Sequence, residues 1–125
     1  MKFAKRVFLV AGIYGLIVVL PQYLLEKKTG DDYPPPITHP EFYYGFVGVT
    51  VAFQIVFLII ARDPARYRPI MIAAILEKAS FVIAVFILYA NHRVPYPMLL
   101  FASIDAFLGM LFIAVYLTTP SQADS

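Results

Sequence analysis

The side chains best placed for chemistry are six polar residues that interrupt long apolar stretches, far from either end of a stretch. They are Tyr14, Gln54, Glu77, Lys78, Ser80 and Asp105. One ionisable group in the hydrocarbon of a membrane costs at least about 2.5 to 3.5 kcal/mol, so three of them in one small chain should face one another or a wet cavity. We expect a central buried cluster, suited to binding the polar part of a ligand or to taking up and releasing a proton.

Helical spacing predicts how this cluster is arranged. Ser80 follows Glu77 by three residues and should share its helix face, whereas Lys78 lies about 100° round the helix from Glu77. The charged side chains of Glu77 and Lys78 should therefore diverge, unless Lys78 reaches sideways. The simplest arrangement pairs Lys78 with Asp105 or Glu77 across the bundle and gives Gln54 a hydrogen bond. A purely structural alternative is a buried ion pair that fixes the register of the helices.

Four apolar stretches must position these residues. Each has about the 20 residues that a helix needs to cross a hydrocarbon core of roughly 30 Å. The chain is 61% hydrophobic and 14% charged, which is too apolar for a soluble domain of 125 residues. We expect an all-α fold, an integral membrane antiparallel four-helix bundle with up-down-up-down order, forming a single domain over residues 1–125. The expected helices are 7–25, 41–61, 70–90 and 98–117.

The segments between and beyond these helices carry their own signals. Residues 26–40 are polar and rich in proline and should form an outer loop, and the small polar tail 118–125 should be disordered. Pro21 removes a backbone donor near the end of the first helix, so a kink or an early stop is expected there.

Lysine and arginine residues beside the spans predict the orientation. One side of the membrane would hold six of them and the other side three: Lys2, Lys5, Arg6, Arg62, Arg66 and Arg68 against Lys27, Lys28 and Arg93. The more basic side is expected to be cytoplasmic, which places both termini in the cytoplasm, most simply at a bacterial inner membrane. Arg62, Arg66 and Arg68 should then lie at the inner interface, near lipid headgroups.

Several classes of function are disfavoured. The absence of cysteine removes disulfides and thiolate metal sites. His39 and His92 both fall in loops, without an acid at ligand spacing in a shared helix, so we expect neither a metal nor a cofactor. The net charge of +2 and the scattered basic residues do not favour nucleic-acid binding. No residues form a recognisable catalytic motif.

The size and four-span layout resemble several families of small bacterial membrane proteins, including the DoxX-like group and the small multidrug carriers. The resemblance is architectural and implies only the fold. The carriers have a membrane-embedded Glu in their first helix, where this chain has Tyr14. Their drug-antiport mechanism is therefore not implied.

Three functions fit the sequence. The leading interpretation is a protein that binds or transports a small polar or amphipathic molecule at the central cluster, with membrane lipids around it and a homodimer or a larger membrane protein as partner. The second is a non-catalytic accessory or assembly subunit of a larger membrane complex, in which the charges pair with a partner's helices. The third, which has the least support, is a membrane-embedded acid/base enzyme acting on a lipid-soluble substrate.

Overall fold

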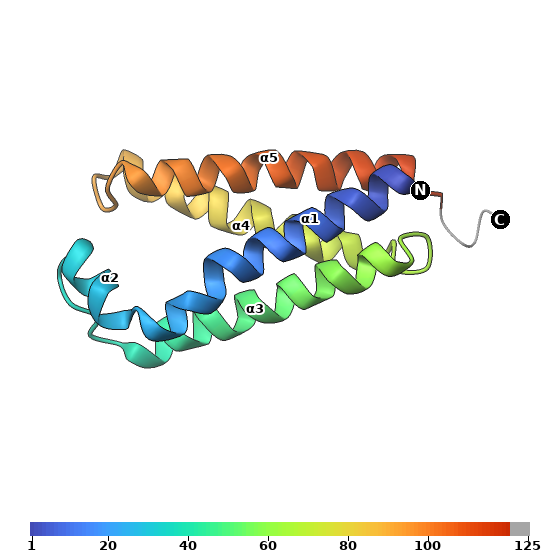
Figure 1. Ribbon diagram of the computed structural model, residues 1–125. Coiled ribbons are helices and arrows are strands. Elements are labelled where there is room, and N and C mark those ends of the chain that lie inside the picture. Colours follow the sequence, from blue (N-terminus) through green and yellow to red (C-terminus); the bar gives the residue numbers. More distant parts are fainter. Residues whose placement is uncertain (121–125) are drawn as a thin grey trace.

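The computed structural model describes residues 1–120, which form a bundle of four long helices and contain no strand. The long helices are α1 (Lys2–Val19), α3 (Pro40–Arg62), α4 (Ile70–Ala90) and α5 (Pro97–Thr118). Figure 1 shows that they alternate in direction, with the amino terminus and the end of α5 at the same end of the bundle. The predicted all-α four-helix bundle is confirmed.

Two short helices follow α1, so the first connection is more helical than the sequence predicts. The α-helical part of the first span ends at Val19, and a 3-10 helix, η1 (Leu20–Leu24), has Pro21 in its first turn. The early stop expected at Pro21 is therefore confirmed. The expected loop 26–40 is wrong in its first half, which forms helix α2 (Glu26–Asp32). This segment has no proline before Pro34, has Glu26 in its first turn, and gains an ion pair between Lys28 and Asp32, which lie four residues apart.

The last helix extends slightly further than the sequence predicts. The expected tail began at residue 118, but α5 continues through Thr118, whose hydroxyl donates a hydrogen bond to the carbonyl of Ala114 (2.8 Å). Residues 121–125 of the expected disordered tail lie outside the described residues.

The four long helices are arranged as two pairs. Helix α1 packs most extensively on α3, and α4 packs most extensively on α5. Glycines allow the first pair to approach closely, because a Cβ at Gly12 would lie 3.0 Å from the backbone oxygen of Gln54, and Gly15 faces the Gln54 side chain. Figure 1 shows the two pairs diverging towards the end of the bundle that carries α2.

The pairs meet in an apolar core near the end that carries the amino terminus and the end of α5, which is the terminal end of the bundle. Phe8, Phe57 and Phe112 are fully buried there, and the rings of Phe8 and Phe112 stack with centroids 4.3 Å apart. The ring of Phe57 stands edge-on to Phe112 at 5.0 Å. Met71 from α4 and Ile60 from α3 complete this layer without exposed surface. The bundle is consequently closed at the terminal end.

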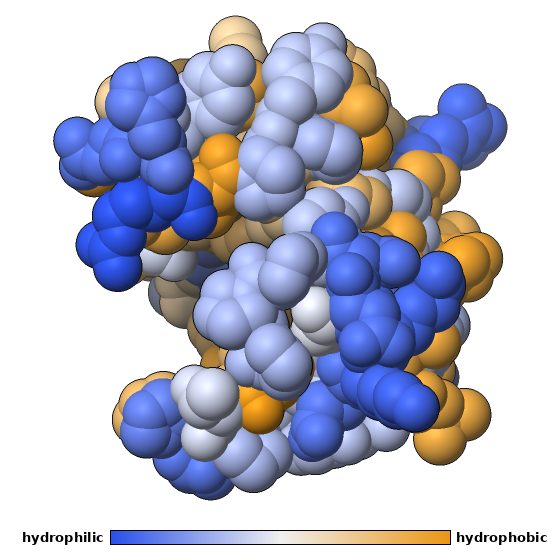
Figure 2. Space-filling model, turned by 90° about the vertical axis from the view of Figure 1, so that its left-hand side faces the viewer, coloured by the Kyte–Doolittle hydropathy of each residue, from blue (hydrophilic) through white to orange (hydrophobic). Residues whose placement is uncertain are grey.

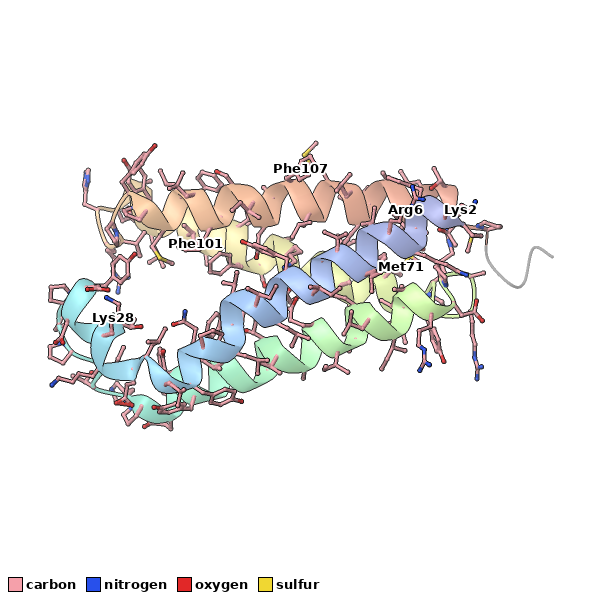
Figure 3. The ribbon with its side chains drawn as sticks, viewed as in Figure 1. Lys2, Arg6, Lys28, Met71, Phe101 and Phe107 are labelled. Atoms are coloured by element: carbon pink, nitrogen blue, oxygen red, sulfur yellow. The ribbon has the colours of Figure 1, made fainter. Side chains whose placement is uncertain are left out.

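The outer surface of the bundle is apolar along its sides. Large hydrophobic side chains such as Ile17, Leu76, Phe107 and Met110 are 62–70% exposed, and the labelled Phe107 points away from the bundle in Figure 3. Figure 2 views the α2 end of the molecule, where hydrophilic residues gather with orange apolar residues at the margins. All four long helices are long and apolar enough to cross a membrane. The chain has the architecture of a small membrane protein.

A candidate ligand cavity with a charged floor

A cavity of about 470 Å³ lies between the two helix pairs where they diverge. Its size is within the roughly 300–1,000 Å³ typical of small-molecule sites. Side chains from all four long helices and from α2 line it. The apolar walls are formed by Val18, Val19, Phe46, Val47, Phe81, Met98 and Phe101.

The floor of the cavity, its deepest part, is a cluster of charged side chains on α4 and α5. The Lys78 Nζ lies 3.3 Å from Asp105 Oδ1, to which it donates a hydrogen bond, and 3.6 Å from Glu77 Oε2. It also lies 5.3 Å from the centre of the Phe57 ring, where the π-face attracts a cation. Lys78 is only 4% exposed, and the side chains of both acids are 17% exposed. Two carboxyl groups therefore share one ammonium group.

Neutral polar groups reach the same depth from the other helix pair. Gln54 on α3 is 1% exposed, and its Nε2 donates to the carbonyl of Thr50 (2.9 Å), one turn earlier. Within residues 1–120, the Gln54 Oε1 is buried and accepts no hydrogen bond, and the same holds for Glu77 Oε2. Tyr14 on α1 also lines the cavity. The absence of a side chain at Gly15 leaves the space that the Gln54 amide occupies.

The mouth of the cavity lies at the α2 end. Lys28, Thr29 and Asp32 of α2 line it, and Lys28 pairs with Asp32 at 3.0 Å. Figure 3 labels Lys28 on the inner side of α2, in front of the space between the helix pairs. Nearby, the Tyr43 hydroxyl donates a hydrogen bond to the carbonyl of Gln22 (2.7 Å), which ties η1 to α3. Helix α2 thus covers part of the mouth.

The structure brings together five of the six residues that the sequence singled out. Tyr14, Gln54, Glu77, Lys78 and Asp105 all line the cavity. The charged groups of Glu77 and Lys78 do not diverge, because the Lys78 side chain reaches sideways between the two acids.

Ser80 does not line the cavity. It is exposed, and its hydroxyl donates to the backbone carbonyl of Glu77 at 3.0 Å. The expectation took Glu77 as the centre of the inward face, but the buried residues of α4 include Met71, Ala74 and Lys78. Because Ser80 follows Lys78 by two residues, it lies about 200° round the helix and faces outward.

Sequence reasoning missed several contributors. Phe57 holds the Lys78 ammonium group, and the aromatic walls and the α2 residues complete the cavity. In a helix that is apolar on every face, the sequence does not show which apolar side chains face a cavity. Among the missed residues, Thr50 could have been found, because it shares a face of its helix with Gln54.

The arginine residues that were expected at lipid headgroups differ in their surroundings. Arg68 Nε donates to the carbonyl of Tyr116 (3.1 Å), and its guanidinium group lies 3.9 Å from the centre of the Tyr116 ring. Arg66 lies over the ring of Tyr67 at 5.4 Å, and both Arg66 and Arg62 are exposed. Arg68 thus joins the loop before α4 to the end of α5, while Arg62 and Arg66 remain the candidates for contact with headgroups.

Comparisons with protein-family models, with curated proteins and with solved structures found no match. Fold and site together define the class: a small protein of four membrane-spanning-capable helices with an internal cavity and a charged floor.

Proposed function

We propose that this protein is an integral membrane protein that binds a small amphipathic molecule in the cavity between its helix pairs. The observation that carries the proposal is a cavity that combines apolar walls with a charged floor near the middle of the helices. Such a space offers apolar contact to the body of a ligand and a few polar groups that fix its orientation. We further propose that the termini face the cytoplasm of a bacterium, because six basic residues flank the spans on that side and three on the other.

The position of the charges favours ligand binding over an assembly role. An assembly determinant would be expected on the outside of the bundle, where a partner helix could reach it. Here Lys78 is buried and already has two carboxyl partners from its own chain. The Lys78 charge therefore does not require a second protein to neutralise it.

The closed aromatic core is an obstacle to transport. Phe8, Phe57 and Phe112 close the terminal end of the bundle, so the bundle gives the cavity no passage through that end. Passage of a ligand across the membrane would need these rings to separate. Binding is accordingly the primary proposal, and transport would be an additional step.

Two neighbouring residues of α1 provide the test. Val18 lines the cavity, whereas Ile17 is 69% exposed on the outer face. Val18→Trp should obstruct the cavity and Ile17→Trp should leave it open, while both variants introduce the same indole group. Native mass spectrometry of protein extracted gently from its own membrane should find one bound small molecule on the wild type and on Ile17→Trp, and none on Val18→Trp. Equal occupancy in all three proteins, or none in any, would contradict the proposal.

A further inference from the structure

The hydrogen-bonding groups at the floor of the cavity are unbalanced. Two of the donors there already have partners: the Lys78 ammonium group lies between two carboxyl groups, and Gln54 Nε2 donates to Thr50, while the Tyr14 hydroxyl can both donate and accept. The Thr50 hydroxyl donates to the carbonyl of Phe46 at 2.7 Å. Two acceptors, Gln54 Oε1 and Glu77 Oε2, are buried without a hydrogen bond in the described part of the chain, although Glu77 Oε2 lies 3.6 Å from the Lys78 ammonium group. A buried acceptor left unpaired is unfavourable by about 1–3 kcal/mol, so both positions favour a ligand that donates.

The charges favour the same kind of ligand. With both acids ionised, Glu77, Asp105 and Lys78 sum to one net negative charge at the floor. A ligand that brought an anion would add to this charge, and one that brought a cation with N–H groups would neutralise it and supply hydrogen-bond donors. Gln54 adds a neutral acceptor to these charged groups. Its amide is almost fully buried on the opposite helix pair and lines the same cavity.

The walls of the cavity determine the length and the apolar character of the rest of the ligand. From Gln54 on the floor to Tyr43 at the mouth, α3 rises through eleven residues, about 16 Å at 1.5 Å per residue. The side chains between them and across the cavity are mainly apolar, including Val47, Phe81 and Phe101. An extended alkyl chain of about ten carbons fits this length.

We propose that the ligand of this cavity is a single-chain amphiphile with a protonated primary amine, whose N–H groups bind Gln54 Oε1 and Glu77 Oε2 while its chain lies between the helix pairs. This inference rests on the proposed function, because it names the ligand class of the same cavity. It separates a primary ammonium group from a quaternary one, which has the charge but no N–H donor.

The test compares four decyl compounds on the wild-type protein in nanodiscs of zwitterionic lipid at pH 7: decylammonium, decanol, decyltrimethylammonium and decanoate. The alkyl chain is constant, so only the head group differs. Native mass spectrometry should show decylammonium binding at least about tenfold more tightly than each of the other three, because a charge-assisted hydrogen bond contributes more than a neutral one. Equal binding of decanol or decyltrimethylammonium, or preferred binding of decanoate, would overturn the inference.

Variants locate the head group. Gln54→Met and Glu77→Gln should each lower the affinity for decylammonium by about tenfold and leave the weak binding of decanol unchanged. Glu41→Gln is the matched control, because the Glu41 side chain is 62% exposed at the start of α3, and it should bind like the wild type. A loss of affinity in Glu41→Gln equal to that in Glu77→Gln would contradict the assignment.

The two proposals fail in different ways. If a molecule extracted with the protein is lost only in Val18→Trp, but the four decyl compounds bind alike, the cavity binds ligands and the amine assignment is wrong. If Val18→Trp and Ile17→Trp bind every compound as the wild type does, the cavity is not the site and both proposals fall.

Discussion

Replacing Lys78 with methionine would leave two acids facing each other without their shared cation. The ammonium group lies 3.3 Å from one carboxyl oxygen and 3.6 Å from the other. At an effective dielectric constant of 20, each contact corresponds to about 5 kcal/mol of Coulomb attraction, against which the desolvation of the ions must be set. Breaking a buried pair by removing one partner typically destabilises a protein by about 3–5 kcal/mol. We expect Lys78→Met to lower the free energy of unfolding by that amount.

Lys28→Met is the matched control for this experiment. Lys28 also forms an ion pair, at 3.0 Å from Asp32, but the two side chains are 67% and 51% exposed. A surface pair between residues four apart contributes only about 0.3–0.5 kcal/mol. Equilibrium unfolding in mixed micelles, followed by the loss of helical circular dichroism, measures both variants on the same scale.

A triple variant separates loss of the cation from loss of side-chain packing. Adding Glu77→Gln and Asp105→Asn to Lys78→Met removes the unpaired charges and should restore most of the lost stability, because the loss comes mainly from buried charge without a partner. A Lys78→Met variant no less stable than Lys28→Met, or a triple variant as unstable as Lys78→Met, would refute this role of the Lys78 ammonium group.

Three other substitutions test the packing around the cavity by the same unfolding assay. Phe112→Ala should lower stability by about 3 kcal/mol because it opens a hole in the aromatic core, whereas Phe107→Ala, at a site 62% exposed, should change it little; equal effects would contradict this core. Gly12→Ala should destabilise by about 1–3 kcal/mol because its Cβ would meet α3, while Gly45, with no neighbour within 4 Å, should accept alanine with a slight gain; tolerance of Gly12→Ala would disprove the close approach. Arg68→Ala should lower the free energy of unfolding by about 1–3 kcal/mol, because it removes the contacts with the carbonyl and the ring of Tyr116 near the end of α5. An unchanged unfolding midpoint would argue against these contacts.

The four long helices could be predicted from the sequence because length and hydropathy alone mark a membrane span. The prediction for the third span, 70–90, coincides with the bounds of α4, where Pro69 precedes the helix and a polar turn follows it. The depth of the charged groups also follows from counting residues, since each residue adds a fixed rise.

The rotation and pairing of the helices could not be predicted in the same way. Faces towards lipid and faces towards the core are both apolar, so hydropathy does not say which side of α4 points inward. The outward position of Ser80 is the direct result, because the inward face is set by Lys78 and not by Glu77. The cavity itself arises where the two helix pairs diverge, and no local sequence pattern predicts that divergence.

An internal cavity requires its floor and walls to be separated from lipid at a depth where the outer face of the same helix is not. Thr50 and Val49 test this directly, because they are adjacent on α3 and differ in depth by about 1.5 Å, yet Thr50 lines the cavity and Val49 is 61% exposed on the outer face. The chain has no cysteine, so Thr50→Cys and Val49→Cys each introduce a single thiol. In lipid bilayers, a small cationic thiosulfonate should modify Thr50→Cys and leave Val49→Cys unmodified. Equal modification of both thiols, or of neither, would contradict an internal cavity at this depth.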